Sequence, residues 1–347
     1  MVDRSTRAEE VAPGSQGYAG GQARSPARGR QGGGPRGRGE GRASLYEEVT
    51  ARIVGELEAG RFPWVQPWTR SPGEAGLAPS LPRNAVSQRA YSGINVLLLW
   101  GAVIARGWPT QGWLTYRQAR ALGGHVRKGE EGTCVVYADR FTPSAEKARA
   151  SESGEEAPSV PFLKRFTLFN LAQCEGLDTQ LLEPAAPLPE CAVEPEGEAL
   201  IAASGVDFRI GGDKAFYAPG ADFVQVPPHP AFHDPVNFYR TACHELCHAT
   251  GHASRLGRTL TGRFGSKDYA REELVAELGA AFTLAALGIR PSVRHADYLG
   301  AWLEVLREDA RAIFRAASLA SKAADWLLSR HEAAKSGAAI SDREKGS

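Results

Sequence analysis

The sequence predicts an α+β protein with two domains, and three observations lead to that prediction. The chain has 347 residues, enough for two domains of ordinary size. Its 42% hydrophobic and 23% charged residues are typical of a globular chain with hydrophobic cores. Helical and strand-like patterns follow one another irregularly, and a segment rich in Pro, Ser and Glu at 143–165 separates two more regular halves.

The first domain is expected to span residues 44–142. Ser44 and Glu47 have the spacing of a helix-capping box, and the apolar residues after them recur at helical spacing. Further on, the pattern predicts a helix over 94–104 and a strand over 133–137. These elements make the first domain a mixture of helices and strands.

Five other segments complete the predicted organisation. Glycine and arginine dominate the N-terminal segment, which has too few large apolar side chains to offset the entropy of ordering. The segments are a disordered basic tail at 1–43, a flexible insertion at 143–165, a strand with a connecting segment at 166–197, the second domain at 198–330, and a polar tail at 331–347.

Several classes of protein are disfavoured by composition. The five cysteines include no C-x-x-C pair, so neither a disulfide framework nor a cysteine zinc site is expected. No run of about 18 apolar residues occurs, and the N-terminus lacks the apolar core of a secretion signal. We therefore expect a cytoplasmic protein that has no membrane partner.

A short motif carries the clearest chemical information. His244-Glu245-Leu246-Cys247-His248 fits the H-E-x-x-H pattern, and positions i and i+4 of a helix share one face, so both imidazoles can bind one ion. Zinc bound there lowers the pKa of a water towards about 7, and Glu245 accepts the proton as general base. The motif predicts a zinc metallohydrolase, and more specifically a metallopeptidase whose protein substrate the sequence does not name.

A catalytic zinc also needs a third protein ligand. The metzincin pattern requires a histidine ten residues after His244, but Ser254 occupies that position and His252 comes too early. A glutamate from a second helix is the alternative.

The helix predicted over 269–287 carries three glutamates near its start: Glu272, Glu273 and Glu277. Glu273 and Glu277 are one turn apart on the same face. They resemble the gluzincin arrangement, in which a ligand glutamate is followed four residues later by an acid that orients a ligand histidine. That resemblance implies that Glu273 binds the metal and Glu277 orients a histidine. The alternative is that both form solvated salt bridges.

Other side chains near the motif have less specific patterns. Cys243 and Cys247 share a face of the helix away from the histidines, and we expect them to pack in the core. Tyr239 precedes the motif by five residues. It is a candidate for stabilising an oxyanion, although core packing is the better expectation.

The first domain is rich in aromatic and basic residues. Five of the seven tryptophans lie between residues 44 and 140, interleaved with arginines and lysines. Rings that stack on bases beside cations that contact phosphates are typical of single-stranded DNA binding. The simpler alternative is that these rings form the core. The candidate DNA-contacting residues are Trp64, Trp68, Arg83, Tyr91, Trp113, Arg117 and Lys128.

The order of these and other residues resembles the ArdC family of plasmid antirestriction proteins, whose N-terminal domain also occurs in TraC-type conjugative primases. The resemblance covers about residues 45–290. It rests on Pro63-Trp64, Tyr91-x-Gly93-x-Asn95, Trp113-x-Thr115, Phe169-Asn170-x-x-Gln173, the zinc helix up to Thr250-Gly251-His252, and Glu272-Glu273-Leu274-Val275-Ala276-Glu277.

The resemblance implies an N-terminal domain that binds single-stranded DNA and a C-terminal zincin-like metallopeptidase domain. The basic tail and the insertion at 143–165 are not part of the family pattern. Two alternative functions remain open. One is a non-catalytic protein that shields single-stranded DNA and has a structural or vestigial zinc site, and the other is a zinc hydrolase that is not a peptidase.

Overall fold

A computed structural model describes residues 44–64, 80–141, 160–178, 194–260, 265–290 and 298–345. The predicted basic tail, Trp68 and most of the predicted insertion lie outside these residues. The described residues all belong to one compact unit, Ala43–Ser347. None of the described helices is both long and apolar enough to cross a membrane.

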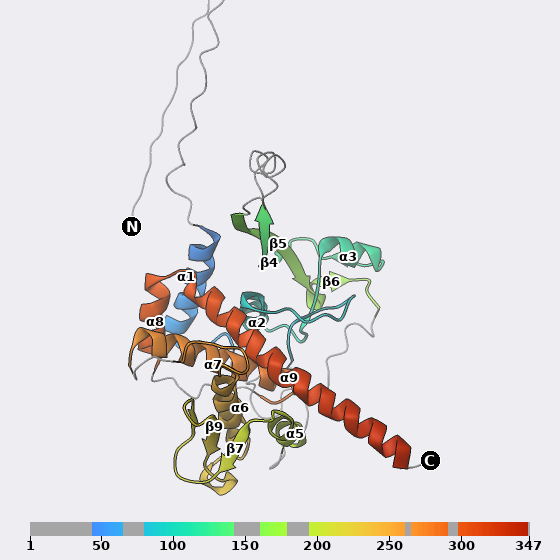
Figure 1. Cartoon of the computed structure of the whole chain (residues 1–347). Coiled ribbons are helices and arrows are strands. Elements are labelled where there is room, and N and C mark those ends of the chain that lie inside the picture. The colour runs from blue at the N-terminus through green and yellow to red at the C-terminus, as the bar shows by residue number, and fades with distance from the viewer. Residues whose placement is uncertain are drawn as a thin grey trace, which may run out of the picture. The chain divides into compact units, whose positions relative to one another are not determined.

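Two helices of the N-terminal half begin or end where the sequence predicts (Figure 1). Helix α1 (Leu45–Glu58) starts at the Ser44–Glu47 capping box, in which each residue's side chain accepts a hydrogen bond from the other's backbone N–H. Helix α2 (Ile94–Arg106) ends at Gly107, whose φ of 63° is left-handed. The predictions for both helices are confirmed.

A four-stranded sheet stands beside α2. Its strands are β1 (Arg83–Asn84), β2 (Gly112–Leu114), β4 (Thr133–Phe141) and β5 (Val160–Asn170), in the order β1-β2-β5-β4. Strands β4 and β5 are antiparallel, with a register from Thr133 opposite Leu168 to Phe141 opposite Val160.

This sheet corrects two predicted boundaries. Strand β5 begins inside the segment 143–165, which we expected to be a flexible insertion, and it pairs with strands of the first domain, which therefore extends beyond residue 142. Pro161 misled the prediction, because proline disfavours most strand positions. It is tolerated here near the start of the strand.

Smaller elements complete the N-terminal half. Helix α3 (Tyr116–Ala121) follows β2, and Thr115 and Gln118 form a second capping box at its start. Strand β3 (His125–Val126) pairs with β6 (Cys174–Glu175), and the short helix η2 (Leu171–Gln173) joins β5 to β6.

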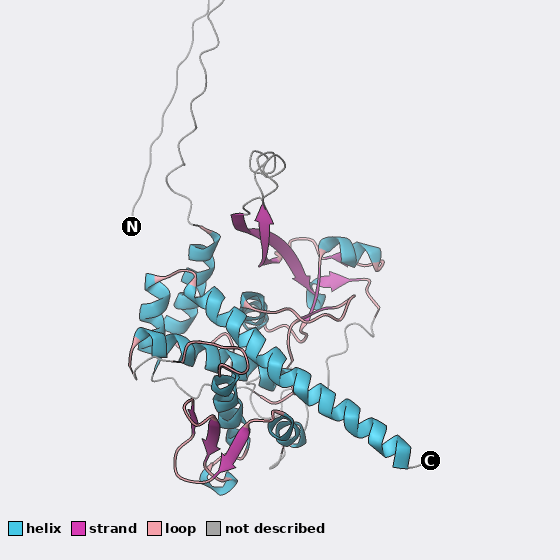
Figure 2. Ribbon diagram, in the orientation of Figure 1, coloured by secondary structure: helices cyan, strands magenta, loops and turns pink. Residues whose placement is uncertain are grey.

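The C-terminal half combines a small sheet with helices (Figure 2). Helix α5 (Pro195–Ala203) precedes strands β7 (Asp207–Ile210), β8 (Phe216–Ala218) and β9 (Phe223–Val226), which form a sheet with β9 in the centre and β8 at one edge. After the short helix η4 (His229–Ala231) come α6 (Val236–Thr250), α7 (Lys267–Ala286), α8 (Leu299–Glu308) and α9 (Ala312–Lys345).

Helix α9 corrects the predicted polar tail at 331–347, because it remains helical to Lys345. His331 on this segment is only 1% exposed, and its Nε2 lies 3.1 Å from Glu196 of α5. Lys335 donates a hydrogen bond to the same carboxylate. These partners come from a distant part of the chain, so the polar composition of the segment did not reveal them.

One hydrophobic core spans both halves of the chain. Side chains of α1 and α2 pack in the same buried cluster as side chains of α7, α8 and α9. Trp100 of α2 contacts Phe282 of α7 edge-to-face with ring centroids 5.7 Å apart, and Trp64 contacts Trp302 of α8 at 6.1 Å. A buried tryptophan removes about 150–250 Å² from water, worth about 4–6 kcal/mol. The predicted fragment 44–142 would lack these partners.

Candidate metal centre

Helix α6 places His244 and His248 on one face, as the i and i+4 spacing predicts. Their Nε2 atoms are 3.2 Å apart. The side chain of His244 is 2% exposed and that of His248 is 13% exposed. Cys243 and Cys247 are buried on another face, which confirms their predicted packing.

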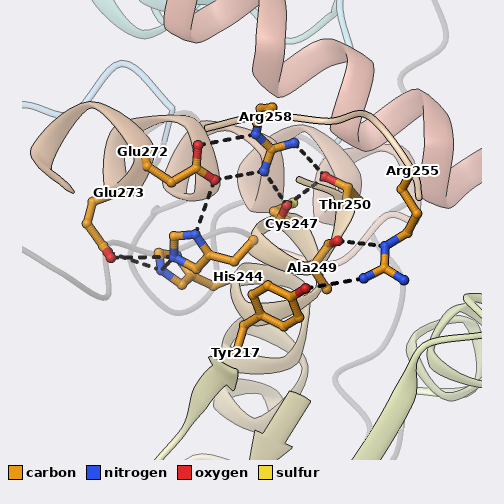
Figure 3. A network of polar contacts seen from close by, with 10 residues as sticks. Tyr217, His244, Cys247, Ala249, Thr250, Arg255, Arg258, Glu272 and Glu273 are labelled. Atoms are coloured by element: carbon orange, nitrogen blue, oxygen red, sulfur yellow. Dashed lines mark hydrogen bonds and ion pairs between the residues drawn. The ribbon is translucent and has the colours of Figure 1, made fainter. Parts of the chain in front are cut away.

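The third donor comes from α7, where Glu273 faces both histidines (Figure 3). Its carboxylate oxygens lie 3.3 Å from Nε2 of His244 and 3.4 Å from Nε2 of His248. Gly279 lets the two helices approach this closely, because a Cβ there would come within 2.8 Å of Cys247 Sγ.

The spacing of the three donors fits a metal ion. Donor atoms bound tetrahedrally at about 2.0–2.1 Å from zinc are about 3.3 Å from one another. The observed separations between His244, His248 and Glu273 are 3.2, 3.3 and 3.4 Å. Two imidazoles and one carboxylate are also the donor set of a catalytic zinc site. The residues present therefore fit a divalent metal.

Buried charge interactions shift the pKa values of these donors in the metal-free protein. Burial alone would lower the pKa of His244, but hydrogen bonds to Glu273 and Glu277 outweigh it and raise that pKa to about 10. His248 has its pKa raised to about 9, because Glu272 and Glu273 outweigh burial in the same way. Burial would raise the pKa of Glu273, but the two histidines hold it well below its usual range.

Two further glutamates orient the histidine rings. Glu277 lies 3.5 Å from Nδ1 of His244, and Glu272 lies 3.3 Å from Nδ1 of His248. An acid at Nδ1 favours the tautomer whose Nε2 lone pair points at the metal. The sequence suggested the orienting role for Glu277 but missed it for Glu272, which neighbours the ligand in sequence and gave no spacing signal.

Arg258 holds Glu272 in place and joins it to the end of α6. Its guanidinium donates to Glu272 at 2.8 Å, to the backbone oxygen of Cys247 at 2.6 Å and to Thr250 Oγ1 at 2.7 Å (Figure 3). The Arg258 side chain is only 5% exposed, so this charge is well shielded from water.

Glu245 lines the same cleft as the three candidate ligands. The cleft has a volume of about 400 Å³. Strand β8 supplies Phe216 and Tyr217 to its wall, and Tyr269 and Tyr298 supply two more aromatic rings. A substrate that enters the cleft would reach Glu245 and the candidate metal ligands together.

The predicted oxyanion role of Tyr239 is wrong. Its side chain is wholly buried, and its hydroxyl donates a 2.7 Å hydrogen bond to Glu198 of α5, away from the cleft. The described tyrosines that do line the cleft are Tyr217, Tyr269 and Tyr298. Tyr269 precedes Glu273 by one helical turn, a spacing that would have pointed to it.

Two of the candidate DNA-stacking rings are also corrected. Trp64 and Trp113 are 0% exposed, so neither offers a face to a base. Tyr91 is partly buried, and its hydroxyl hydrogen-bonds with Asn84. The candidate cations Arg83, Arg117 and Lys128 are exposed, as a phosphate contact requires.

The two acids on α7 lead to a prediction that separates a ligand from an orienting group. Glu273→Ala is expected to weaken metal binding more than Glu277→Ala, because it removes a donor atom, whereas loss of an orienting acid costs about 10- to 100-fold in affinity. Competition with a chromogenic chelator measures both variants. A larger loss with Glu277→Ala would exchange the two roles.

Comparison with known proteins agrees with this geometry. Residues 195–319 match the family model of a zincin-like metallopeptidase, and residues 43–169 match that of the N-terminal domain of anti-restriction factor ArdC. The fold and the site therefore define a zincin-like metallopeptidase domain joined to an ArdC-type N-terminal domain. The chain belongs to the ArdC family of antirestriction proteins.

Full-length relatives show how much of the chain this relationship covers. The crystal structure of antirestriction protein ArdC from plasmid R388 in its metal-free form is 38% identical, covers 83% of this chain and 98% of its own, and has a TM-score of 0.69. The Mn(II)-bound form of that protein has the same identity and coverage and a TM-score of 0.68.

Two sequence relatives extend the comparison. The uncharacterized protein y4eC of Sinorhizobium fredii is 41% identical over 82% of this chain and 91% of its own length. DNA primase TraC of Escherichia coli is 37% identical over 83% of this chain, but the match covers only 20% of the primase.

Proposed function

We propose that this protein is a zinc-dependent peptidase that acts on a protein near single-stranded DNA. The observation that carries the proposal is the buried set of His244, His248 and Glu273, which shares one cleft with Glu245. A purely structural metal site has no need of an additional carboxylate beside an open cleft.

The proposed reaction assigns a task to each group of residues. A divalent metal held by the two histidines and Glu273 would polarise a carbonyl and lower the pKa of water. Glu245 would take a proton from the attacking water and pass it to the leaving amine. Glu272 and Glu277 would keep the two imidazoles aimed at the metal.

Zinc is the ion we propose, although a relative binds Mn(II) in its crystal structure. Imidazole donors suit zinc well, and affinity for such a site generally rises from manganese to zinc. Elemental analysis of protein purified without added metal tests the assignment. About one zinc per chain is expected, and manganese in its place would refute zinc.

Glu245→Gln tests the catalytic proposal. The substitution keeps the size of the side chain but removes its basicity, so hydrolysis should fall by about 10²–10⁴-fold while the metal stays bound. New protein N-termini formed in a cell extract, counted with wild type and variant, measure the activity on whichever proteins in the extract are substrates.

The outcomes separate the alternatives. Equal numbers of new N-termini with wild type, Glu245→Gln and buffer would leave a non-catalytic protein with a structural or vestigial metal site. Hydrolysis of a non-peptide bond that depends on Glu245 would instead favour another class of zinc hydrolase.

The second proposed function is binding of single-stranded DNA by the N-terminal half. It is supported by the match of residues 43–169 to the ArdC N-terminal domain and by the relationship to a protein named as a DNA primase. We propose that the protein works in the cytoplasm and acts there against restriction. Titration of a labelled oligonucleotide with full-length protein tests the binding, and no binding at low salt would refute it.

A further inference from the structure

One stretch of the chain contains no acidic residue. From residue 75 to residue 129 there is neither Asp nor Glu, although the chain has 40 acidic residues in all. The same stretch contains seven basic residues: Arg83, Arg89, Arg106, Arg117, Arg120, Arg127 and Lys128. A surface formed within it attracts anions without local competition from carboxylates.

Helix α3 displays part of this stretch. Tyr116, Arg117 and Arg120 are all exposed, whereas Ala119 is buried. At about 100° per residue the three exposed residues lie within one outward face of the helix. Beyond α3 the positive surface ends, because Arg127 pairs with Glu130 at 2.6 Å.

A turn that joins β1 to the residues before α2 lies against the start of α3. Asn84 donates a 3.1 Å hydrogen bond to Gln118 of α3, and Ala85 donates a 2.9 Å backbone bond to the oxygen of Trp113. The turn itself is exposed and carries Arg83 and Arg89. Its two arginines therefore extend the cationic face of α3.

An aromatic ring belongs to the same face. The Tyr116 side chain is 55% exposed, and Phe169 of β5 supports its ring edge-to-face at a centroid distance of 6.4 Å. A supported ring with an open face can stack on an unpaired base. Trp64 and Trp113, by contrast, are closed off by the core.

We propose that these five residues, Arg83, Arg89, Tyr116, Arg117 and Arg120, form the surface that binds single-stranded DNA. We name them the α3 surface. The arginines contact successive phosphates while Tyr116 stacks on a base. This inference rests on the proposed DNA binding and locates it on the molecule.

The test uses full-length protein and a short labelled oligothymidylate titrated at several salt concentrations. Arg117→Gln with Arg120→Gln is expected to flatten the slope of log affinity against log salt by about 1.4, because each lost phosphate contact on a single strand contributes about 0.7. Tyr116→Ala should weaken binding by about 5- to 150-fold with little change of slope, and Tyr116→Phe should retain binding, because stacking needs only the ring.

The matched control removes two charges elsewhere. Lys322 and Arg330 are exposed on α9, and replacing both with glutamine lowers the net charge equally but should leave the slope unchanged. Circular dichroism checks that each variant is folded.

The outcomes distinguish the inference from the function beneath it. Failure of the wild type to bind would overturn both. Binding by the wild type that the α3 variants share in affinity and slope would overturn the α3 surface alone. Equal competition by polyglutamate and by unlabelled oligothymidylate would show a general anion surface and would overturn the stacking role of Tyr116.

Discussion

Replacing His248 with alanine is expected to lower metal affinity by more than about 100-fold, which exceeds the usual cost of losing an orienting group. The variant keeps only His244 and Glu273 as donors, and two donors hold a divalent ion weakly. Elemental analysis after dialysis against a mild chelator measures the loss. His244→Ala should remove the metal as well.

His244→Ala has an additional consequence for stability. It leaves Glu273, 4% exposed, and Glu277, 3% exposed, without the imidazole that lies between them. Breaking a buried ion pair by removing one partner costs about 3–5 kcal/mol. Denaturant titration of metal-free proteins should therefore find this variant less stable than His248→Ala.

His252→Ala is the matched control, because it removes a histidine just beyond the end of the same helix. His252 hydrogen-bonds with Ser254 and lies 3.6 Å from Asp222 rather than from the metal donors. This variant should retain its metal. Loss of metal from His252→Ala together with full retention by His248→Ala would refute the ligand set.

The sequence predicted the metal donors well because their geometry is local. The spacing of His244 and His248 within one helix sets their common face, and the fold only has to bring a second helix alongside. The role of Glu273 required the resemblance to a known arrangement. That of Arg258 depends on a loop that folds back to the end of α6, which no local periodicity encodes.

The errors share a physical cause, which is contact between distant parts of the chain. Tyr239 was assigned from its distance to the motif, but its hydroxyl bonds with Glu198, which lies 41 residues earlier. Trp64 looked available for stacking because its partner Trp302 belongs to the other half of the chain. Composition counts aromatic rings but does not say which of them the fold will cover.

The shared core also changes how the two functions are related. Helix α7 carries Leu274 and Phe282 as well as Glu273, and these two apolar side chains pack in one cluster with α1 and α2. The helix that supplies a metal donor is thus supported by the N-terminal half. For this reason DNA binding and metal binding are both best measured on the full-length protein.

Metal binding is also expected to depend steeply on pH. The pKa values of His244 and His248 in the metal-free protein are raised to about 10 and about 9, so both rings carry a proton at pH 7. A metal binds only the neutral imidazole and must displace both protons. Apparent affinity should therefore rise by about 100-fold per pH unit between pH 7 and about 9, then level off near pH 10.

Stability of the metal-free protein should change in the opposite direction. A pKa raised above its unfolded value of 6.5 stabilises the fold fully below that pH, and this contribution is lost as pH rises through 9 to 10. Glu273, whose pKa is lowered, contributes above its ordinary value of 4.5 and loses this contribution only in acid.

Calorimetry of zinc binding in two buffers with different ionisation enthalpies measures the protons released. About two protons per metal are expected at pH 7, and nearly none above pH 10. Denaturant titration of metal-free protein over the same range should show stability falling as zinc affinity rises. Zinc binding that releases no protons at pH 7 would mean that the histidines are already neutral there, and that the carboxylates of Glu272, Glu273 and Glu277 do not hold them charged.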